Sequence, residues 1–184
     1  MKQSTSILII AVLMIFAAAV SRILLYPISF SPLIAMALFG GAVIKNKKLA
    51  FLLPLAAIFL SDVLFEVFKI APGFYGWGQL VNYGLLMLVT FMGTYLKKLN
   101  FITVAGFTVA SALIFYFLSN SSVFVMSSGY YAKNFAGYIE CMIAGLPFLK
   151  ASLISTASYS LLFFGAYFLA TKYFQKEELA YNKI

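Results

Sequence analysis

The side chains of this sequence that could do chemistry are the few ionisable groups that interrupt its apolar stretches. Arg22 interrupts the first long stretch, and Asp62 and Glu66 interrupt the third. Asp62 and Glu66 are four residues apart, so a helix would place both carboxyl groups on one face. An ionisable side chain inside a bilayer is costly and marks a functional site by default. These three groups could bind a polar solute, or could lock two helices together as an ion pair.

Other kinds of chemistry are excluded by the residues that the sequence lacks. With no histidine, there is no Ser-His triad, no HExxH zinc site and no imidazole acid–base catalyst. The single cysteine, Cys141, allows neither an internal disulfide nor a CxxC redox pair. There is also no phosphate-cradling P-loop, so any ATP hydrolysis would come from a partner. We therefore expect no metal site, no resident cofactor and no enzymatic activity.

The composition indicates an integral membrane protein of one domain. Of the 184 residues, 64% are hydrophobic and only 10% are charged, against about 45–50% and about 25% in soluble domains. Such a chain cannot cover itself with polar groups, which excludes a soluble enzyme, a disordered tail and a nucleic-acid-binding module. The net charge of +8 is then best interpreted as an orientation signal in a bilayer.

The apolar stretches predict an all-α membrane bundle of six spans, because a membrane-spanning helix needs about 20 apolar residues. The predicted spans are residues 7–25, 32–44, 49–68, 79–96, 101–118 and 151–173. We expect the first to be a retained helix rather than a signal peptide, and the second to be short. A seventh helical piece, residues 135–149, is predicted to lie at the membrane interface before the last span.

The orientation follows from the distribution of lysine and arginine, which favour the cytoplasmic side. With the N-terminus inside, nine basic residues lie on that side: Lys2, Lys45, Lys47, Lys48, Lys97, Lys98, Lys172, Lys176 and Lys183. Four lie outside: Arg22, Lys69, Lys133 and Lys150. The prediction is a multi-pass protein of the bacterial inner membrane with both termini in the cytoplasm.

In this topology the polar groups collect on the outer side. Arg22 and Asp62 would both lie about 20 Å above the inner surface, at about 1.5 Å per helical residue. The predicted substrate-binding residues on this side are Arg22, Asp62, Glu66, Trp77, Asn82, Asn120, Glu140 and Lys150. Two interpretations stay open: a structural ion pair with Glu66 reaching the outer surface, or an outward-facing cavity lined by these groups.

Aromatic and small residues allow two uses each. Several aromatic residues fall on the outer side: Tyr75, Trp77, Tyr83, Tyr130, Tyr131 and Tyr138. They could form an interfacial belt, or their rings could sandwich a flat ligand. Small residues four apart, such as Ala37 and Gly41, let helices approach closely, either inside the protein or against a partner helix. We expect Cys141 to act as a small apolar residue.

Two stretches of the sequence resemble an uncharacterised family of bacterial membrane proteins described as transport proteins. The first runs from Pro27 to Gly41 and contains two prolines and a terminal glycine pair. The second runs from Leu53 to Asp62. The resemblance extends from Arg22 to about Tyr167, with Ser29 where that family usually has asparagine. The overall architecture is similar to the S components of energy-coupling-factor transporters. That likeness implies binding of a vitamin or metal ion from outside, and docking onto a coupling subunit driven by two ATPases.

Three functions follow as hypotheses. The first is a transport component that binds a small organic, vitamin-like solute in an outward-facing pocket, with the lipid bilayer, the solute and a transmembrane coupling subunit with ATPases as partners. The second is a non-catalytic structural subunit of a larger membrane complex. The third, an intramembrane enzyme using Asp62 and Glu66 as a carboxylate pair, is disfavoured by the absence of histidine and of a nucleophile elbow.

Overall fold

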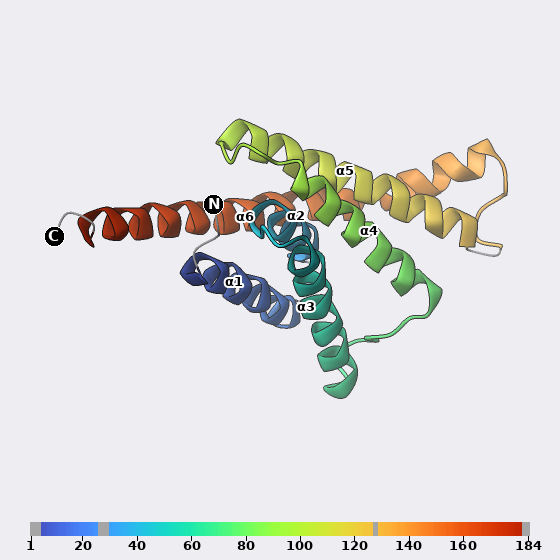
Figure 1. The fold of residues 1–184 in the computed structure, drawn as a ribbon. Coiled ribbons are helices and arrows are strands. Elements are labelled where there is room, and N and C mark those ends of the chain that lie inside the picture. The colour runs from blue at the N-terminus through green and yellow to red at the C-terminus, as the bar shows by residue number, and fades with distance from the viewer. Residues whose placement is uncertain (1–4, 26–29, 127–128, 182–184) are drawn as a thin grey trace.

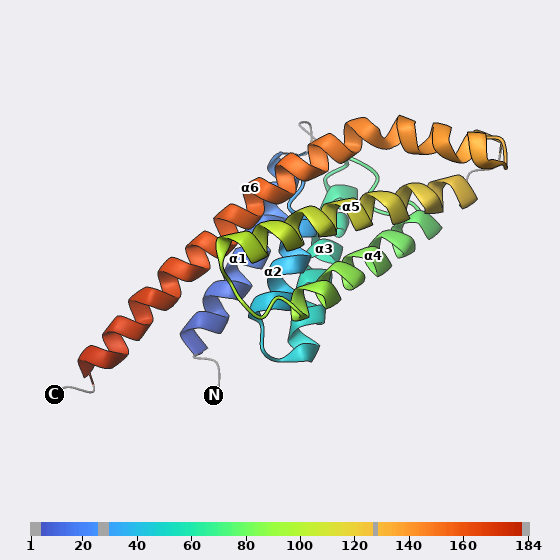
Figure 2. The same ribbon diagram turned by 90° about the horizontal axis from the view of Figure 1, so that it is seen from above.

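The computed structural model describes the backbone of residues 5–25, 30–126 and 129–181, and side chains as far as residue 174. The described part is all-helical. Six helices follow one another: α1 (Thr5–Leu24), α2 (Leu33–Val43), α3 (Lys47–Val67), α4 (Trp77–Thr94), α5 (Phe101–Met126) and α6 (Phe135–Tyr181). They form one bundle with α2 in its middle (Figures 1 and 2). The predicted all-α bundle is confirmed. Pro27 and Ser29, which belong to the stretch that carries the family resemblance, lie outside the described residues.

The helices have the length and surface of membrane-spanning segments. Four stretches in the described residues are long and apolar enough to cross a bilayer: α1, α3, α5 and the part of α6 from Phe135 to Phe174. Large apolar side chains are exposed all along them, for example Leu13, Ile102 and Leu161. A soluble protein would not expose so many in contiguous faces. The chain is a multi-pass helical membrane protein.

The short second helix was predicted, and its surroundings explain how it can be short. Helix α2 contacts each of the other five helices, and residues Ala35 to Phe39 are fully buried. A helix that is apolar all round belongs in a core. Because α2 is enclosed by protein rather than by lipid, it does not need the full thickness of the membrane.

Helices α2 and α4 cross in close contact through two glycines. A Cβ atom on Gly41 would clash with the backbone carbonyl of Thr90, and one on Gly93 would clash with the carbonyl of Leu38. Ala37 and Gly41 are both buried. Of the two uses considered for these small residues, the structure therefore shows helix packing inside the protein.

Helix α5 is longer than predicted, and its last two turns lie beyond the predicted end of the fifth span. The prediction ended it at residue 118, whereas the helix continues to Met126. The serine side chains bond back to carbonyls of the preceding turn: Ser121 Oγ to Phe117 at 2.7 Å and Ser122 Oγ to Ser119 at 2.7 Å. These bonds satisfy the polar hydroxyls within the helix, so the polar run does not end it.

Helix α6 replaces two elements that were predicted to be separate. The expected interfacial helix at 135–149 and last span at 151–173 form one continuous helix that runs on to Tyr181. The separation was wrong because Leu149, Lys150 and Ala151 are all good helix formers. Figure 2 shows a bend in the orange part of α6, and Pro147 within the helix is the expected cause of such a bend.

The two ends of the bundle carry different connections. Helix α1 begins, and α6 ends, at the end that also holds the α4–α5 connection, residues 95–100 (Figure 1). We call this the termini end. The α3–α4 connection, residues 68–76, and residues 129–134, which precede α6, lie at the opposite end, which we call the loop end (Figure 1). The candidate site is at the loop end.

Candidate functional site

A buried ion pair joins α1 to α3 near the loop end. Arg22 Nη1 donates to Asp62 Oδ1 and, at 2.6 Å, to the hydroxyl of Ser61. The guanidinium also lies 4.7 Å from the centre of the Phe65 ring, a cation–π arrangement. Asp62 is only 2% exposed. Such a buried charge persists only when it is paired and hydrogen-bonded, and the pair connects residues 40 positions apart.

The second oxygen of Asp62 is held by α4. Tyr83 donates its hydroxyl proton to Oδ2 at 2.5 Å, and the Gln79 amide nitrogen donates to the same oxygen at 2.9 Å. The Gln79 nitrogen is also 2.8 Å from the Tyr83 hydroxyl. Both carboxylate oxygens therefore have donors, and Asp62 connects α1, α3 and α4.

The same network fixes the α3–α4 connection. The Gly73 amide donates to Glu66 Oε2 at 2.9 Å, and the Gly73 carbonyl accepts from Gln79 at 2.9 Å. The Tyr75 amide donates to Gln79 Oε1 at 3.3 Å. Gly73 lies so close to the backbone carbonyl of Asp62 that a Cβ atom would overlap it. Gln79, at 5% exposure, thus links the ion pair to the loop.

Replacing Gln79 by alanine should loosen this connection. The change removes bonds to Asp62, to the Gly73 carbonyl and to the Tyr75 amide, and leaves buried polar groups unsatisfied at about 1–3 kcal/mol. We expect hydrogen–deuterium exchange of the 68–76 amides to accelerate about tenfold or more. Thr94→Ala is the matched control in the same helix, because that exposed hydroxyl bonds only to Phe91. Unchanged exchange in the Gln79 variant would contradict this role.

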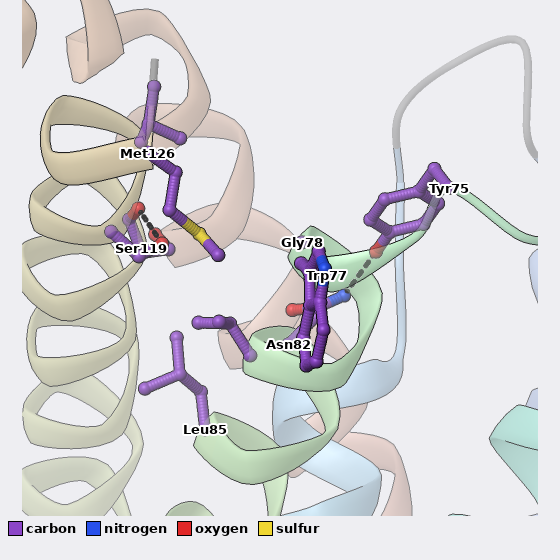
Figure 3. A pocket seen from close by; sticks show the side chains of 10 residues that line it. Tyr75, Trp77, Gly78, Asn82, Leu85, Ser119 and Met126 are labelled. Atoms are coloured by element: carbon purple, nitrogen blue, oxygen red, sulfur yellow. Dashed lines mark hydrogen bonds between the residues drawn. The ribbon is translucent and has the colours of Figure 1, made fainter. Parts of the chain in front are cut away.

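A cavity of about 790 Å³ opens between the start of α4 and the end of α5. Its lining residues are Tyr75, Trp77, Gly78, Val81, Asn82, Leu85, Ser119, Ser122, Val123 and Met126. Figure 3 shows the Met126 side chain reaching from α5 toward α4, with the rings of Tyr75 and Trp77 on the opposite wall. The cavity is mainly apolar with a few polar groups, as small-molecule sites are.

The polar groups of the cavity are uncharged. Asn82 Nδ2 donates to the Tyr75 hydroxyl at 2.9 Å (Figure 3), which leaves the phenol proton as a donor. Burial raises the pKa of the Tyr75 phenol; the negative charge of Asp62 acts in the same direction, while the Asn82 bond and Arg22 lower it. Tyr75 is therefore neutral at physiological pH. Ser119 and Ser122 donate to α5 carbonyls, so their oxygen atoms are left to accept.

The eight predicted site residues are not brought together in one place. Trp77 and Asn82 line the cavity. Arg22, Asp62 and Glu66 form the network behind it.

The other three predicted residues lie apart from the cavity. Asn120 faces α6, where its amide is against Gly145 and its backbone carbonyl is 3.5 Å from Cys141 Sγ. Glu140 and Lys150 are exposed on α6. The cavity is therefore lined by neutral residues, and the charged residues Arg22, Asp62 and Glu66 lie in the hydrogen-bond network behind it.

Sequence reasoning missed Gln79, Ser119 and Ser122 as site residues. For Gln79 a signal existed, because it precedes Asn82 by three and Tyr83 by four residues, which places all three near one face of a helix. The serines lie beyond residue 118, where the fifth span was predicted to end, so their shared helical face could not be recognised. Within the described residues, no three side chains of the metal-ligating types are grouped.

Comparison with known proteins gives the family without a function. Among curated proteins and among solved structures, none matches this chain. One family profile, described as "Family of unknown function (DUF6580)", matches residues 2–178. Because this match covers nearly the whole sequence, the chain belongs to that family.

Proposed function

We propose that the chain is the solute-binding component of a membrane transport system and that it takes a small organic, vitamin-like molecule into the cavity between α4 and α5. The observation that carries the proposal is the cavity itself. Its volume of about 790 Å³ lies within the roughly 300–1,000 Å³ of small-molecule sites. Its wall combines two aromatic rings with hydrogen-bonding groups at one end of a membrane bundle.

The lysine distribution supports an orientation with this cavity outside. It favours both termini in the cytoplasm of a bacterial inner membrane. The loop end, which is opposite the termini, then faces the exterior, and the cavity meets the solute before it crosses. Energy for transport would come from a transmembrane coupling subunit with ATPases, since the sequence has no P-loop.

The chemistry of the wall favours a neutral molecule with a flat ring. Among the described residues that line the cavity, none is lysine, arginine, aspartate or glutamate. Arg22, one of the predicted binding residues, is neutralised by Asp62. The rings of Tyr75 and Trp77 offer apolar faces, and the Asn82 amide and Tyr75 hydroxyl offer hydrogen bonds to a ring nitrogen or carbonyl. The charged network acts by holding Tyr75 in place through Gln79.

The test is uptake or binding of a panel of radiolabelled vitamins by the full chain with Trp77→Ala and Asn82→Ala variants. For the solute that binds, we expect each variant to weaken binding about tenfold or more, because the ring and the amide each contribute at least about 1.4 kcal/mol at a desolvated contact. Leu13→Ala is the control, since Leu13 is an exposed apolar residue of α1 that does not line the cavity. Equal binding by all three variants would exclude this cavity as the site.

A structural subunit of a larger complex is the second candidate, and the fully buried core around α2 favours it. Such a core gives a rigid body with small-residue contacts inside. Stoichiometric membrane partners that co-purify with both the wild type and Trp77→Ala, together with no binding from the vitamin panel, would favour this role over solute capture.

A further inference from the structure

A second hollow lies at the other end of the bundle, between the first half of α5 and the middle of α6. Its volume is about 770 Å³, and Leu99, Val104, Ala105, Ala157, Leu161 and Phe164 are among its lining residues. The hydroxyls of Thr108 and Ser160 belong to the same wall but are themselves buried. Ser158 also lines the groove and is exposed, but most of the surface that an occupant would meet is apolar.

The length of this groove matches one leaflet of a bilayer. Its α6 wall runs from Ala157 to Phe168, which is about 16 Å at about 1.5 Å per residue. The hydrocarbon core of a membrane is about 30 Å thick, so the groove covers about half of it. The groove starts at the α4–α5 connection, where Leu99 and Asn100 form its mouth.

The mouth of the groove is basic. Lys97 and Lys98 directly precede Leu99 and are exposed. Lys172 is exposed and follows Phe168 by four residues, so it continues the α6 face that lines the groove. An apolar channel of leaflet length with lysines at its interfacial end is complementary to a lipid that carries a negative headgroup.

A partner helix fits the groove less well. The rim consists of large exposed side chains, namely Phe101 at 78%, Leu161 at 68% and Phe168 at 61%. Helices that associate in membranes usually meet through small residues that let the backbones approach, and this rim would keep an incoming backbone away. A thin, flexible acyl chain passes between such side chains.

We infer that the α5–α6 groove is a binding site for an anionic phospholipid, with an acyl chain along the groove and the phosphate beside Lys97, Lys98 and Lys172. This site is independent of the solute cavity, because the two lie at opposite ends of α5 and share no lining residue. The site predicts both a preference for negative headgroups and a requirement for open space in the groove.

The headgroup preference is tested by native mass spectrometry on the detergent-purified full chain mixed with equal amounts of dioleoylphosphatidylglycerol and dioleoylphosphatidylcholine. We expect retained phosphatidylglycerol to exceed phosphatidylcholine about tenfold, because lysines near the headgroup favour a lipid with a negative charge. The double change Lys97→Gln with Lys98→Gln should bring the ratio close to one. Lys47→Gln with Lys48→Gln is the matched control, because it removes the same charge at the start of α3 and should keep the preference.

The acyl-chain part is tested by filling the groove. Gly165 lines it, and a Cβ atom there meets nothing within 4 Å, so Gly165→Phe should fold and occupy the space. We expect retained phosphatidylglycerol to fall at least fivefold. Gly106→Phe is the control, because Gly106 has the same open surroundings but is not a lining residue. Equal retention of the two lipids by the wild type would overturn the site. Full retention of phosphatidylglycerol by Gly165→Phe would also overturn it. So would a Gly165→Phe variant that loses self-association but still retains the lipid.

Discussion

Replacing Asp62 by alanine should be among the most damaging single changes in this protein, with a loss of about 3–5 kcal/mol in the free energy of unfolding. The reason is that Arg22 would stay largely enclosed beside Phe65 with its charge uncompensated. Gln79 and Tyr83 would each lose their carboxylate acceptor as well. The same change would therefore loosen α1, α3 and α4 from one another.

This loss is measured as the midpoint of thermal unfolding in detergent, followed by the fluorescence of Trp77, the single tryptophan. For a chain of this size the loss corresponds to a fall of about 10 °C. Glu140→Ala is the matched control, because it also removes a carboxylate but at an exposed position on α6. If the two variants had the same midpoint of thermal unfolding, the Arg22–Asp62 pair would not be what holds α1 against α3.

A double variant separates the cost of an unpaired charge from the loss of packing. In Arg22→Met with Asp62→Leu, no charge is left buried, and apolar side chains of similar size fill the space. Such replacements of whole ion pairs are often neutral or stabilising. We expect the double variant to regain part of the lost stability relative to Asp62→Ala, with the remainder due to the unpaired Gln79 and Tyr83. A double variant less stable than Asp62→Ala would show that the charges themselves stabilise the fold.

The pairing of Arg22 with Asp62 could be anticipated from the sequence, because the height of a residue in the bilayer depends only on its position along its helix. Counting residues from the start of each apolar stretch gives a height, and two opposite charges at one height have few other partners. What counting cannot give is the direction in which a side chain points around its helix. Asn120 and Ser119 are adjacent in height, yet they differ by about 100° in direction. Ser119 therefore lines the cavity while Asn120 packs against α6.

Helix ends were the other part of the fold that sequence could not fix. The polar run after Leu118 suggests a loop by composition, but serines can bond to their own helix when the surroundings are apolar. Lys150 suggests a membrane boundary, but a lysine at the surface of a long helix does not interrupt it. The position of the cavity depends on the first of these outcomes, because two extra turns of α5 bring Ser122 and Met126 opposite Trp77.

The second large effect is expected at the crossing of α2 and α4. Gly41→Ala should destabilise the protein by about 3 kcal/mol, although alanine normally favours a helix over glycine by about 1 kcal/mol. The new methyl group would overlap the carbonyl of Thr90 and press on the Cα of Gly93. These are backbone atoms in helices on both sides, so the overlap cannot be relieved by a side-chain rotation and requires the helices to separate.

Separation at this point would propagate, because α2 touches all five other helices and its side chains from Ala35 to Phe39 are fully buried. Gly106→Ala is the matched control: it is also a glycine within an apolar helix, but its Cβ position is open, so helix propensity should make it neutral or stabilising by up to about 1 kcal/mol. We therefore expect two glycine-to-alanine substitutions to change the stability in opposite directions. The changes are measured as midpoints of thermal unfolding in the same detergent. Should both glycine variants melt at or above the wild-type temperature, α2 and α4 do not cross as closely as this fold requires.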